Sequence, residues 1–304
     1  MTNNQCATPL VSVAIIAYNQ RKFLGELLDS VVSQDYPNIE IIVADDASTD
    51  GSRELCQSYA ERYPGKIICV LADVNGGITN NSNAAFRRCR GDYIAWMGGD
   101  DLMLPGKIAA QVQYMESRSQ CSVSFHNVEV FESDSGVILG HFNDLGTRKI
   151  GTFRTVLRDK TYNCACATMT RTSRCPPGGF DVKLPVSSDW KFWLECLSGG
   201  GEMHYIPRVL GRYRRHNGNV TKRGGLGYKR AQADHLNTIT WAMVECPQHG
   251  REAIVALAET LRQMRWISPI TYFYYLKMSL SIKISFLAAT SLIVYIVTFG
   301  RVLL

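Results

Sequence analysis

The sequence predicts an α/β fold with a mostly parallel sheet flanked by helices, followed by a helical C-terminal tail. Three observations lead to this fold class. Short apolar, β-branched runs alternate with segments of helical spacing over the first hundred residues, this alternation changes after residue 120, and no acidic residue occurs from Trp266 to Leu304. Alternating strands and helices are typical of parallel sheets with right-handed crossovers.

In the first part, each predicted strand is followed by a segment with a helical period. Val11–Ala17 (VSVAIIA) is the clearest strand, and apolar residues from Phe23 to Val32 then recur with the spacing of a helix. The further strands expected here are Ile39–Ala44, Ile67–Leu71 and Tyr93–Met97. The further helices expected are Ser52–Tyr63, Asn83–Cys89 and one that begins near Pro105 and runs to about Met115.

After residue 120 the pattern is less regular. Cys121–Phe131 and Val137–His141 are expected to form a hairpin around Ser133–Gly136. The other strands expected are Cys164–Thr170 and Tyr205–Tyr213. The helices expected are Asp189–Leu197, Lys229–Val244 and Arg251–Trp266.

Composition and charge exclude several classes of protein. Hydrophobic residues make up 46% and charged residues 20% of the 304 residues, which is typical of a globular chain. The formal net charge of +6 is mild, although eight bases and no acid lie between Glu202 and Asp234. No recognised nucleic-acid-binding module surrounds that basic stretch, so we expect no nucleic-acid partner.

The ten cysteines form no recognisable framework. Cys164 and Cys166 are separated by one residue, and no CxxC pair occurs. We expect buried, reduced thiols in a cytosolic domain rather than a set of disulfides. The N-terminal segment has no basic region followed by an apolar stretch, so we expect no signal peptide.

Two pairs of aspartates, Asp45-Asp46 and Asp100-Asp101, directly follow predicted strands. In a parallel sheet both pairs would face the crevice at the carboxyl ends of the strands. A single Asp there is commonly an Asx turn or a helix cap, and that interpretation stays open for Asp45. Converging carboxylates repel unless a cation lies between them, and Mg²⁺ or Mn²⁺ with a nucleoside diphosphate would satisfy both charge and geometry.

Two glycines, Gly98 and Gly99, come just before the second acidic pair. Because glycine has no Cβ, the backbone at these positions can approach a bulky ligand closely. The chain has neither a GxGxxG after a strand nor a GxxxxGK[ST]. Dinucleotide-cofactor and P-loop sites therefore have no support.

An ordered set of motifs resembles the family 2 glycosyltransferases, which have the Rossmann-like GT-A fold. The motifs are PLVSVAIIAYN (9–19), IEIIVADDASTDGS (39–52), NGG (75–77), GDYIAWMGGDD (91–101), GGFDVKLPVSSDWKFWLE (178–195) and YRRHNGNVT (213–221). The domain organisation we then expect is a catalytic domain over 1–225, divided into a nucleotide-binding half (9–118) and an acceptor half (119–225). A helical extension (226–265) and a hydrophobic membrane-associated segment (266–304) would follow.

The resemblance also assigns the donor and metal sites. It implies that Asp46 recognises the nucleotide base with Asp45 adjacent, and that Ala17, Tyr18 and Asn75 line the donor pocket. It implies that Asp100 and Asp101 bind the ribose and the diphosphate with its Mn²⁺ or Mg²⁺. Many relatives have Asp-x-Asp-Asp here, whereas this chain has Gly98 at the first position. That departure leaves open which of Asp100 and Asp101 ligates the metal directly.

Asp189 matches the catalytic Asp of the family's Glu-Asp motif, and Ser188 stands where the family has Glu. An acceptor hydroxyl that attacks an anomeric carbon needs a base nearby, which agrees with this assignment. The alternative is that Asp189 only caps a helix. Of the neighbouring tryptophans, Trp193 is expected in the core, and Trp190 could stack on a sugar of the acceptor.

Arg214, Arg215 and His216 match the family's late basic motif, which closes over the donor. The resemblance implies that Arg214 contacts the donor and that His216 is a metal ligand. The alternative for this basic stretch is a solvated surface or a contact with lipid headgroups.

The C-terminal segment contains 17 uncharged residues, Ile284–Gly300, between Lys283 and Arg301. A membrane-spanning helix needs about 17–25 apolar residues, so this run is at the short end. We expect contact with membrane lipids through a single span or through helices that lie in the interface. The alternative is a helix packed on the catalytic domain.

The expected function is therefore an inverting, metal-dependent transfer of a sugar from a nucleotide-sugar donor to a hydroxyl of a saccharide acceptor. The acceptor is expected to be linked to polyprenyl diphosphate, as in surface polysaccharide or O-antigen assembly, at the cytoplasmic face of the inner membrane. Two alternatives stay open: a nucleotidyltransferase, and a membrane-anchored nucleotide-sugar-binding protein that has lost catalysis. Gly98 and Ser188 are the features that favour the second alternative.

Overall fold

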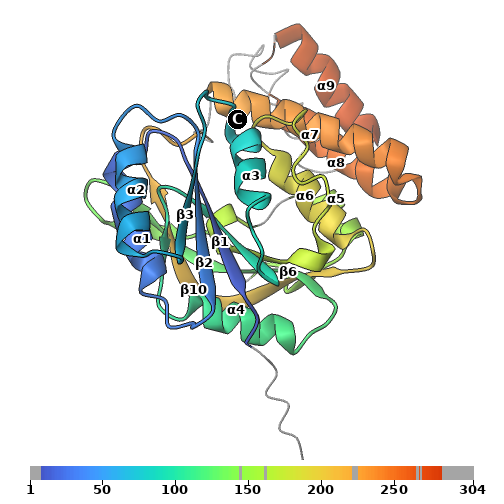
Figure 1. The fold of residues 1–304 in the computed structure, drawn as a ribbon. Coiled ribbons are helices and arrows are strands. Elements are labelled where there is room, and N and C mark those ends of the chain that lie inside the picture. The colour runs from blue at the N-terminus through green and yellow to red at the C-terminus, as the bar shows by residue number, and fades with distance from the viewer. Residues whose placement is uncertain are drawn as a thin grey trace, which may run out of the picture.

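The computed structural model describes residues 8–143, 146–160, 163–220, 225–264, 267 and 269–282. In this part of the chain, one twisted sheet has the strand order β3-β2-β1-β4-β9-β6-β10-β5, with β7 beside β6 and β8 beside β10. Helices cover both of its faces (Figure 1). The strands are β1 (Val11–Ala17), β2 (Ile39–Asp45), β3 (Ile67–Leu71), β4 (Tyr93–Gly98), β5 (Leu102–Met103), β6 (Cys121–Glu132), β7 (Ile138–His141), β8 (Ile150–Gly151), β9 (Thr168–Arg171) and β10 (Glu202–Arg215).

The first four strands of this order confirm the predicted parallel alternation. β1 and β3 have the expected bounds, and β2 and β4 each extend one residue further than expected. All four pair in parallel, and the residues of β1, β2 and β4 are almost all buried, as in a sheet covered on both faces. The connecting helices are α1 (Arg21–Val32), α2 (Ser52–Arg62), α3 (Ile78–Phe86) and α4 (Lys107–Glu116).

The second half of the sheet is mixed rather than parallel. β9 runs antiparallel to both β4 and β6, whereas β10 is parallel to β6. The predicted hairpin is confirmed, because β7 pairs antiparallel with β6. The expectation of a strand over Cys164–Thr170 was wrong at its start, where Ala165–Ala167 form a 3₁₀ turn before β9 begins. The prediction of a mostly parallel sheet therefore applies to the N-terminal half only.

Helix α3 begins five residues earlier than the spacing predicted. Gly77 precedes it with a φ of +83°, a conformation that favours glycine. The buried residues Asn81 and Asn83 use their side-chain amides to donate to the carbonyls of Ala44 and Phe180. Because these buried positions are polar, the hydrophobic period of the helix was hidden in the sequence.

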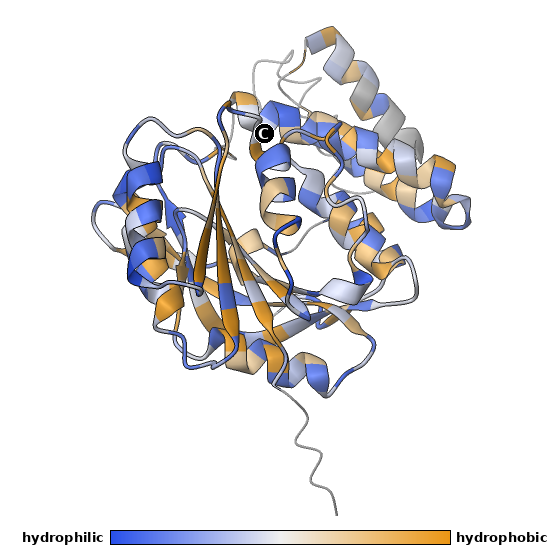
Figure 2. Ribbon diagram, in the orientation of Figure 1, coloured by the Kyte–Doolittle hydropathy of each residue, from blue (hydrophilic) through white to orange (hydrophobic). Residues whose placement is uncertain are grey.

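An aromatic cluster forms the core between β4, α3 and α6 (Ser188–Leu197). Trp96 lies at its centre, within 5.0–6.3 Å of the rings of Phe86, Phe180, Phe192 and Trp193. Trp193 is thus a core residue, as expected. The central strands are coloured largely as hydrophobic in Figure 2, in keeping with their burial. At the start of α6, the hydroxyl of Ser188 lies 3.0 Å from the hydroxyl of Thr79, so α6 begins next to the N-terminus of α3.

The C-terminal helices pack together beside the sheet (Figure 1). They are α7 (Leu226–Glu245), α8 (Gly250–Gln263) and α9 (Pro269–Ile282), and α5 (Phe153–Asp159), which the sequence analysis did not foresee, contacts α8. Tyr272 and Leu276 of α9 are buried, and the Tyr272 hydroxyl donates to the carbonyl of Arg262 at 3.0 Å. Within the described ranges, no helix has the length and apolarity that crossing a bilayer requires. The run Ile284–Gly300 lies outside the described residues.

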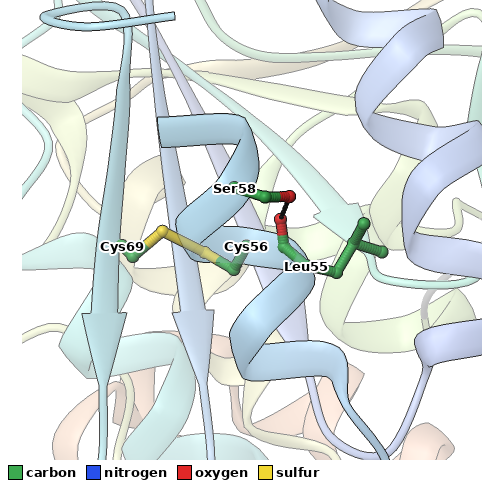
Figure 3. Close-up of a disulfide and its surroundings, with 4 residues drawn as sticks. All are labelled: Leu55, Cys56, Ser58 and Cys69. Atoms are coloured by element: carbon green, nitrogen blue, oxygen red, sulfur yellow. Dashed lines mark hydrogen bonds between the residues drawn. A yellow bond between two sulfur atoms is a disulfide. The ribbon is translucent and has the colours of Figure 1, made fainter. Parts of the chain in front are cut away.

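A disulfide joins Cys56 on α2 to Cys69 on β3 (Figure 3). The expectation that all cysteines are reduced was therefore wrong for this pair. The two residues are only 13 positions apart but lie on different elements, which the α2–β3 turn brings within 6.3 Å between their Cα atoms. No spacing rule links such a pair in advance.

Candidate active site

The strand register brings both acidic pairs to one edge of the sheet. Ala17 pairs with Asp45, and Ile16 pairs with Gly98, so β1, β2 and β4 end at the same level. Asp45-Asp46 and Asp100-Asp101 therefore open onto the same edge. This edge is the usual ligand-binding side of a parallel α/β sheet.

Asp100 meets the loop that follows β10. Its Oδ2 lies 2.8 Å from Nε2 of His216 and 3.4 Å from the side-chain amide of Asn219. The backbone N–H of Gly218 donates to Nδ1 of His216 at 3.1 Å, so in this arrangement Nε2 carries the proton and donates to Asp100. No residue of the described chain bonds Oδ1 of Asp100, and the side chain is 16% exposed. Asp100 thus keeps one oxygen available at the crevice.

Asp101 is turned away from the crevice. It is buried, and its Oδ1 accepts the backbone N–H of Arg214 at 2.9 Å. Burial raises the pKa of Asp101 well above its ordinary value, and the neighbouring Asp100 charge raises it further. Of the two carboxylates, Asp100 is therefore the one placed to meet a ligand.

Arg214 holds Asp100 in place from the interior of the protein. Its Nε donates to the carbonyl of Asp100 at 2.7 Å, its Nη2 pairs with Glu26, and its guanidinium lies between the rings of Phe23 and Phe131. The side chain is 6% exposed. The expected contact between Arg214 and the donor has no support here, because the side chain is almost fully enclosed and its Nε and Nη2 bond groups of the protein.

The glycines before Asp100 allow a close approach of backbone and side chains. A Cβ on Gly98 would lie 2.9 Å from Oδ1 of Asp100, and one on Gly99 would collide with Oε1 of Gln20. That Oε1 is buried and has no partner among the described residues. These two positions therefore exclude larger residues at this turn.

The first acidic pair divides into two different environments. Both oxygens of Asp46 accept backbone N–H groups at 2.8 Å, from Gly76 and Gly77. Asn75 in turn donates to the carbonyl of Asp46 at 3.2 Å, so Asp46 organises the 75–77 loop. Asp45 is 1% exposed, and its Oδ1 accepts the N–H of Ser48, as in an Asx turn. Its Oδ2 has no partner in the described structure.

The end of β1 offers an aromatic side chain beside these groups. Tyr18 is 49% exposed, whereas Ala17 is buried and its carbonyl accepts the N–H of Asp46 at 3.1 Å. Tyr18 is thus free to stack on a planar ligand, while Ala17 holds the acidic loop in place.

Asp189 lies in the first turn of α6, in a loop held by α7. Ser187 donates to Oδ1 of Asp189 at 3.4 Å, and Ser187 also contacts Nε2 of His235 at 3.0 Å. Asp234 accepts the backbone N–H groups of Val186 and Ser187, both at 2.8 Å. Burial raises the pKa of Asp189, and the Asp234 charge adds to this rise. A carboxylate with a raised pKa is suited to accept a proton.

The expected acceptor role of Trp190 is wrong for this structure. The indole is completely buried, and its Nε1 donates to the carbonyl of Val156 at 3.1 Å. The ring also meets His235 edge to face, with 5.2 Å between the ring centroids. Because no face of this ring reaches solvent, a sugar cannot stack on it.

Several residues of the site were not singled out from the sequence. Asn219 lies within the YRRHNGNVT motif, but only the fold shows that it bonds Asp100. In the sequence, Asp234 is distinguished only as the first acidic residue after the basic stretch. Glu26 and Gln20 had no signal, because each reaches the site from α1 or the residue before it.

The metal-binding capacity of the site is limited to two protein side chains. In the described ranges, no group of three or more His, Cys, Asp or Glu side chains could hold an ion. Asp100 and His216 together offer a free carboxylate oxygen and an imidazole, a set that suits Mn²⁺ when ligand oxygens complete the shell. Nε2 of His216 can ligate an ion only by giving up the proton that it donates to Asp100.

Comparison with known proteins shows similarity to one family of enzymes. The model of the family described as "Glycosyl transferase family 2" matches residues 12–173. The chain is 31% identical to WfaP of Escherichia coli over 216 residues, which cover 70% of this chain and 80% of WfaP. WfaP is named as a UDP-Glc:alpha-D-GlcNAc-diphosphoundecaprenol beta-1,3-glucosyltransferase.

Two solved structures share the fold. TarS of S. aureus (residues 1–349) has a TM-score of 0.66 at 16% identity, over 90% of this chain and 80% of that one, and it has also been solved with UDP-GlcNAc. The mannosyltransferase PcManGT of Pyrobaculum calidifontis, solved with GDP-Man and Mn²⁺, has a TM-score of 0.60 at 19% identity, over 96% and 81% of the two chains.

Proposed function

The chain belongs to glycosyl transferase family 2, and from this premise we propose that it transfers a sugar from a nucleotide-sugar donor to a hydroxyl of a lipid-linked saccharide. The observation that carries the proposal is the arrangement of Asp100. Its free oxygen lies at the carboxyl edge of the sheet, and His216, 116 residues later in the chain, lies beside it.

The nucleoside would bind beside Asp45 and Tyr18. Oδ2 of Asp45 is a buried acceptor without a partner among the described residues, and a base N–H would satisfy it. Tyr18 offers an exposed ring for stacking on the base. This assigns base recognition to Asp45 rather than to Asp46, whose two oxygens already hold the 75–77 loop.

The diphosphate would lie beside Asp100, whose Oδ1 has no partner among the described residues, at the turn that Gly98 and Gly99 allow to pack closely. Asp100 and His216 would hold Mn²⁺ or Mg²⁺ there. When bound, such an ion neutralises charge on a departing diphosphate. Arg214 and Asn219 keep Asp100 in place through the bonds described above.

Asp189 would act as the base. Its carboxylate takes the proton of the acceptor hydroxyl, and the hydroxyl oxygen forms a bond to the anomeric carbon of the donor sugar. The bond between that carbon and the diphosphate oxygen breaks at the same time, and the nucleoside diphosphate leaves with the electron pair. A single displacement of this kind inverts the anomeric configuration.

The names and bound ligands of three similar proteins support the choice of substrates and of the ion. WfaP is named for transfer from a UDP-sugar to a saccharide on diphosphoundecaprenol, and TarS has been solved with UDP-GlcNAc. PcManGT was solved with Mn²⁺. We therefore propose a role in the assembly of a surface polysaccharide on a lipid carrier at a membrane surface, with a UDP-sugar as the first donor to test.

The test is a transfer assay on the full-length chain with Mn²⁺. The donors are UDP-Glc, UDP-GlcNAc and GDP-Man, and the acceptor is an N-acetylglucosaminyl diphosphate esterified to an alkyl chain. Release of nucleoside diphosphate that depends on both donor and acceptor supports the proposal. Nucleotide binding without either transfer or hydrolysis would favour the binding-protein alternative instead.

A further inference from the structure

A cavity of about 400 Å³ lies between α6, α7 and the 181–184 segment, apart from the nucleotide site. Its polar and aromatic lining consists of Asp181, Lys183, Lys191, Asn237, Thr240 and Trp241. We propose that this cavity is a subsite for a hexopyranose unit of the acceptor saccharide. The inference rests on the proposed function and adds a place on the protein where the acceptor is held.

The charged groups of the cavity largely neutralise one another. Oδ2 of Asp181 accepts from Nζ of Lys191 at 2.7 Å, and its Oδ1 accepts the backbone N–H of Lys183 at 3.0 Å. Glu195 lies 3.8 Å from the same Lys191 amine. An anion site needs converging cations without partners, whereas here only the Lys183 ammonium lacks one among the described groups. The cavity therefore suits an uncharged ligand.

The remaining polar groups match the hydroxyls of a sugar. Neither the amide of Asn237 nor the indole N–H of Trp241 has a hydrogen-bond partner among the described residues. An amide both donates and accepts, an indole donates, and an ammonium donates three times. The Trp241 ring is held by Lys191, 4.9 Å from its centroid, and by Phe153 at 6.4 Å. A fixed aromatic side chain with nearby unpaired polar groups is typical of a small-ligand site.

The cavity is connected to the proposed base through the chain segment before α6. This segment runs alongside α7 in space. Asp234 accepts the backbone N–H groups of Val186 and Ser187, and Asn237 and Trp241 line the cavity together with residues of the 181–184 segment. From Asp234 to Asn237 and Trp241 is one to two helical turns, roughly 5–10 Å along the axis. Leu184 of the cavity accepts from Thr79, which also contacts Ser188 next to Asp189. A saccharide seated here can thus extend toward Asp189.

The test uses saturation-transfer NMR on the full-length chain with the methyl glycosides of glucose, galactose, N-acetylglucosamine and rhamnose as probes. We expect saturation transfer to at least one glycoside, retained when UDP and Mn²⁺ are added. Asn237→Ala and Trp241→Ala should each weaken that signal at least several-fold. Val244→Ala, an exposed residue of the same helix, is the matched control and should leave it unchanged.

Each outcome decides one question. No signal for any glycoside, a signal unchanged by both substitutions, or a signal abolished by inorganic phosphate would overturn the subsite. Asn237 is exposed and on a helix surface, so its replacement should leave the fold intact even if Trp241→Ala does not. UDP binding, measured on the same samples, reports on the proposed function separately, because UDP and the glycosides are expected at different places.

Discussion

Oδ2 of Asp234 accepts the backbone N–H of Ser187 at 2.8 Å, two residues before Asp189. Through this bond, a residue of the helical extension holds the loop that presents the proposed base. Asp234 also acts on Asp189 electrostatically, because its charge contributes to the raised pKa of that carboxyl. If Asp189 is the base, as we propose, the extension beyond the family match thus helps to position the site.

Asp234→Asn should shift the acidic limb of the pH–rate profile toward lower pH. The substitution removes a negative charge that raises the pKa of Asp189, so Asp189 stays deprotonated to a lower pH. Rates of transfer measured across the acid range test this. A profile that keeps its midpoint while the melting temperature falls would reduce Asp234 to a structural role.

Asp189→Asn should lower kcat by about 100- to 10,000-fold, since a positioned general base contributes that much. Because burial disfavours the charged form of Asp189, the melting temperature should stay the same or rise. Initial rates and a thermal melt on the same sample provide the measurement. Glu54→Gln, an exposed carboxylate on α2, is the control. Undiminished activity in Asp189→Asn would show that the base lies elsewhere.

In the wild type, activity should be lost as the pH falls through the pKa of Asp189. That pKa is raised above the ordinary value of about 3.9, so the loss begins at a higher pH than for a solvated aspartate. The same carboxyl binds its proton more readily in the folded state than in the unfolded state. Its own contribution to stability therefore increases as the pH falls through that range. Rate and stability profiles should thus move in opposite directions for this group.

Arg214→Lys should destabilise the protein by about 1–3 kcal/mol, because the hydrogen bond to the Asp100 carbonyl and the stacking between Phe23 and Phe131 are lost. As Asp100 loosens, more Mn²⁺ should be needed for half-maximal activity. Denaturant unfolding and a Mn²⁺ activation curve measure the two effects. A weaker affinity for the donor with unchanged stability would show instead that Arg214 contacts the donor.

Replacing both Cys56 and Cys69 by Ser should lower the free energy of unfolding by about 2–4 kcal/mol, since the bond closes a short loop in the unfolded chain. Activity at low temperature should be unchanged, because α2 and β3 contribute none of the proposed catalytic groups. In the wild type, alkylation of the denatured, unreduced protein should leave these two thiols unmodified. If both are alkylated, the pair is reduced in the purified protein.

The sequence analysis found the elements that are marked by apolar residues, either as a nearly continuous run or with helical spacing. The strands around Val13, Ile42 and Ile94 are nearly continuous apolar runs buried on both faces, so their pattern alone located them within one residue. It displaced α3, since Asn81 and Asn83 are buried through hydrogen bonds and not through apolar surface. It also missed α5, which has only seven residues and so too few turns to show a helical period. β5 and β8, two residues each, are too short to have a period.

The candidate site was only partly predictable for a related reason. An acidic residue at the end of a predicted strand is visible in the sequence, and Asp100 and Asp45 were identified in this way. Which oxygen stays free depends on partners far away in the sequence. The backbone N–H of Arg214 donates to Oδ1 of Asp101, and the backbone N–H groups of Gly76 and Gly77 donate to the two oxygens of Asp46. Burial likewise excludes the predicted acceptor contact of Trp190. Its position in the sequence did not indicate that the ring is fully buried.

The central claim is that Asp100 and His216 form the metal and diphosphate end of a nucleotide-sugar site. Calorimetric titration of UDP into the full-length chain, with and without Mn²⁺, tests it most directly. We predict binding that is strengthened by Mn²⁺ in the wild type and in Glu54→Gln, an exposed control on α2, but that loses this strengthening in Asp100→Asn. Equal UDP affinity in Asp100→Asn and the wild type, with the same response to Mn²⁺, would contradict it.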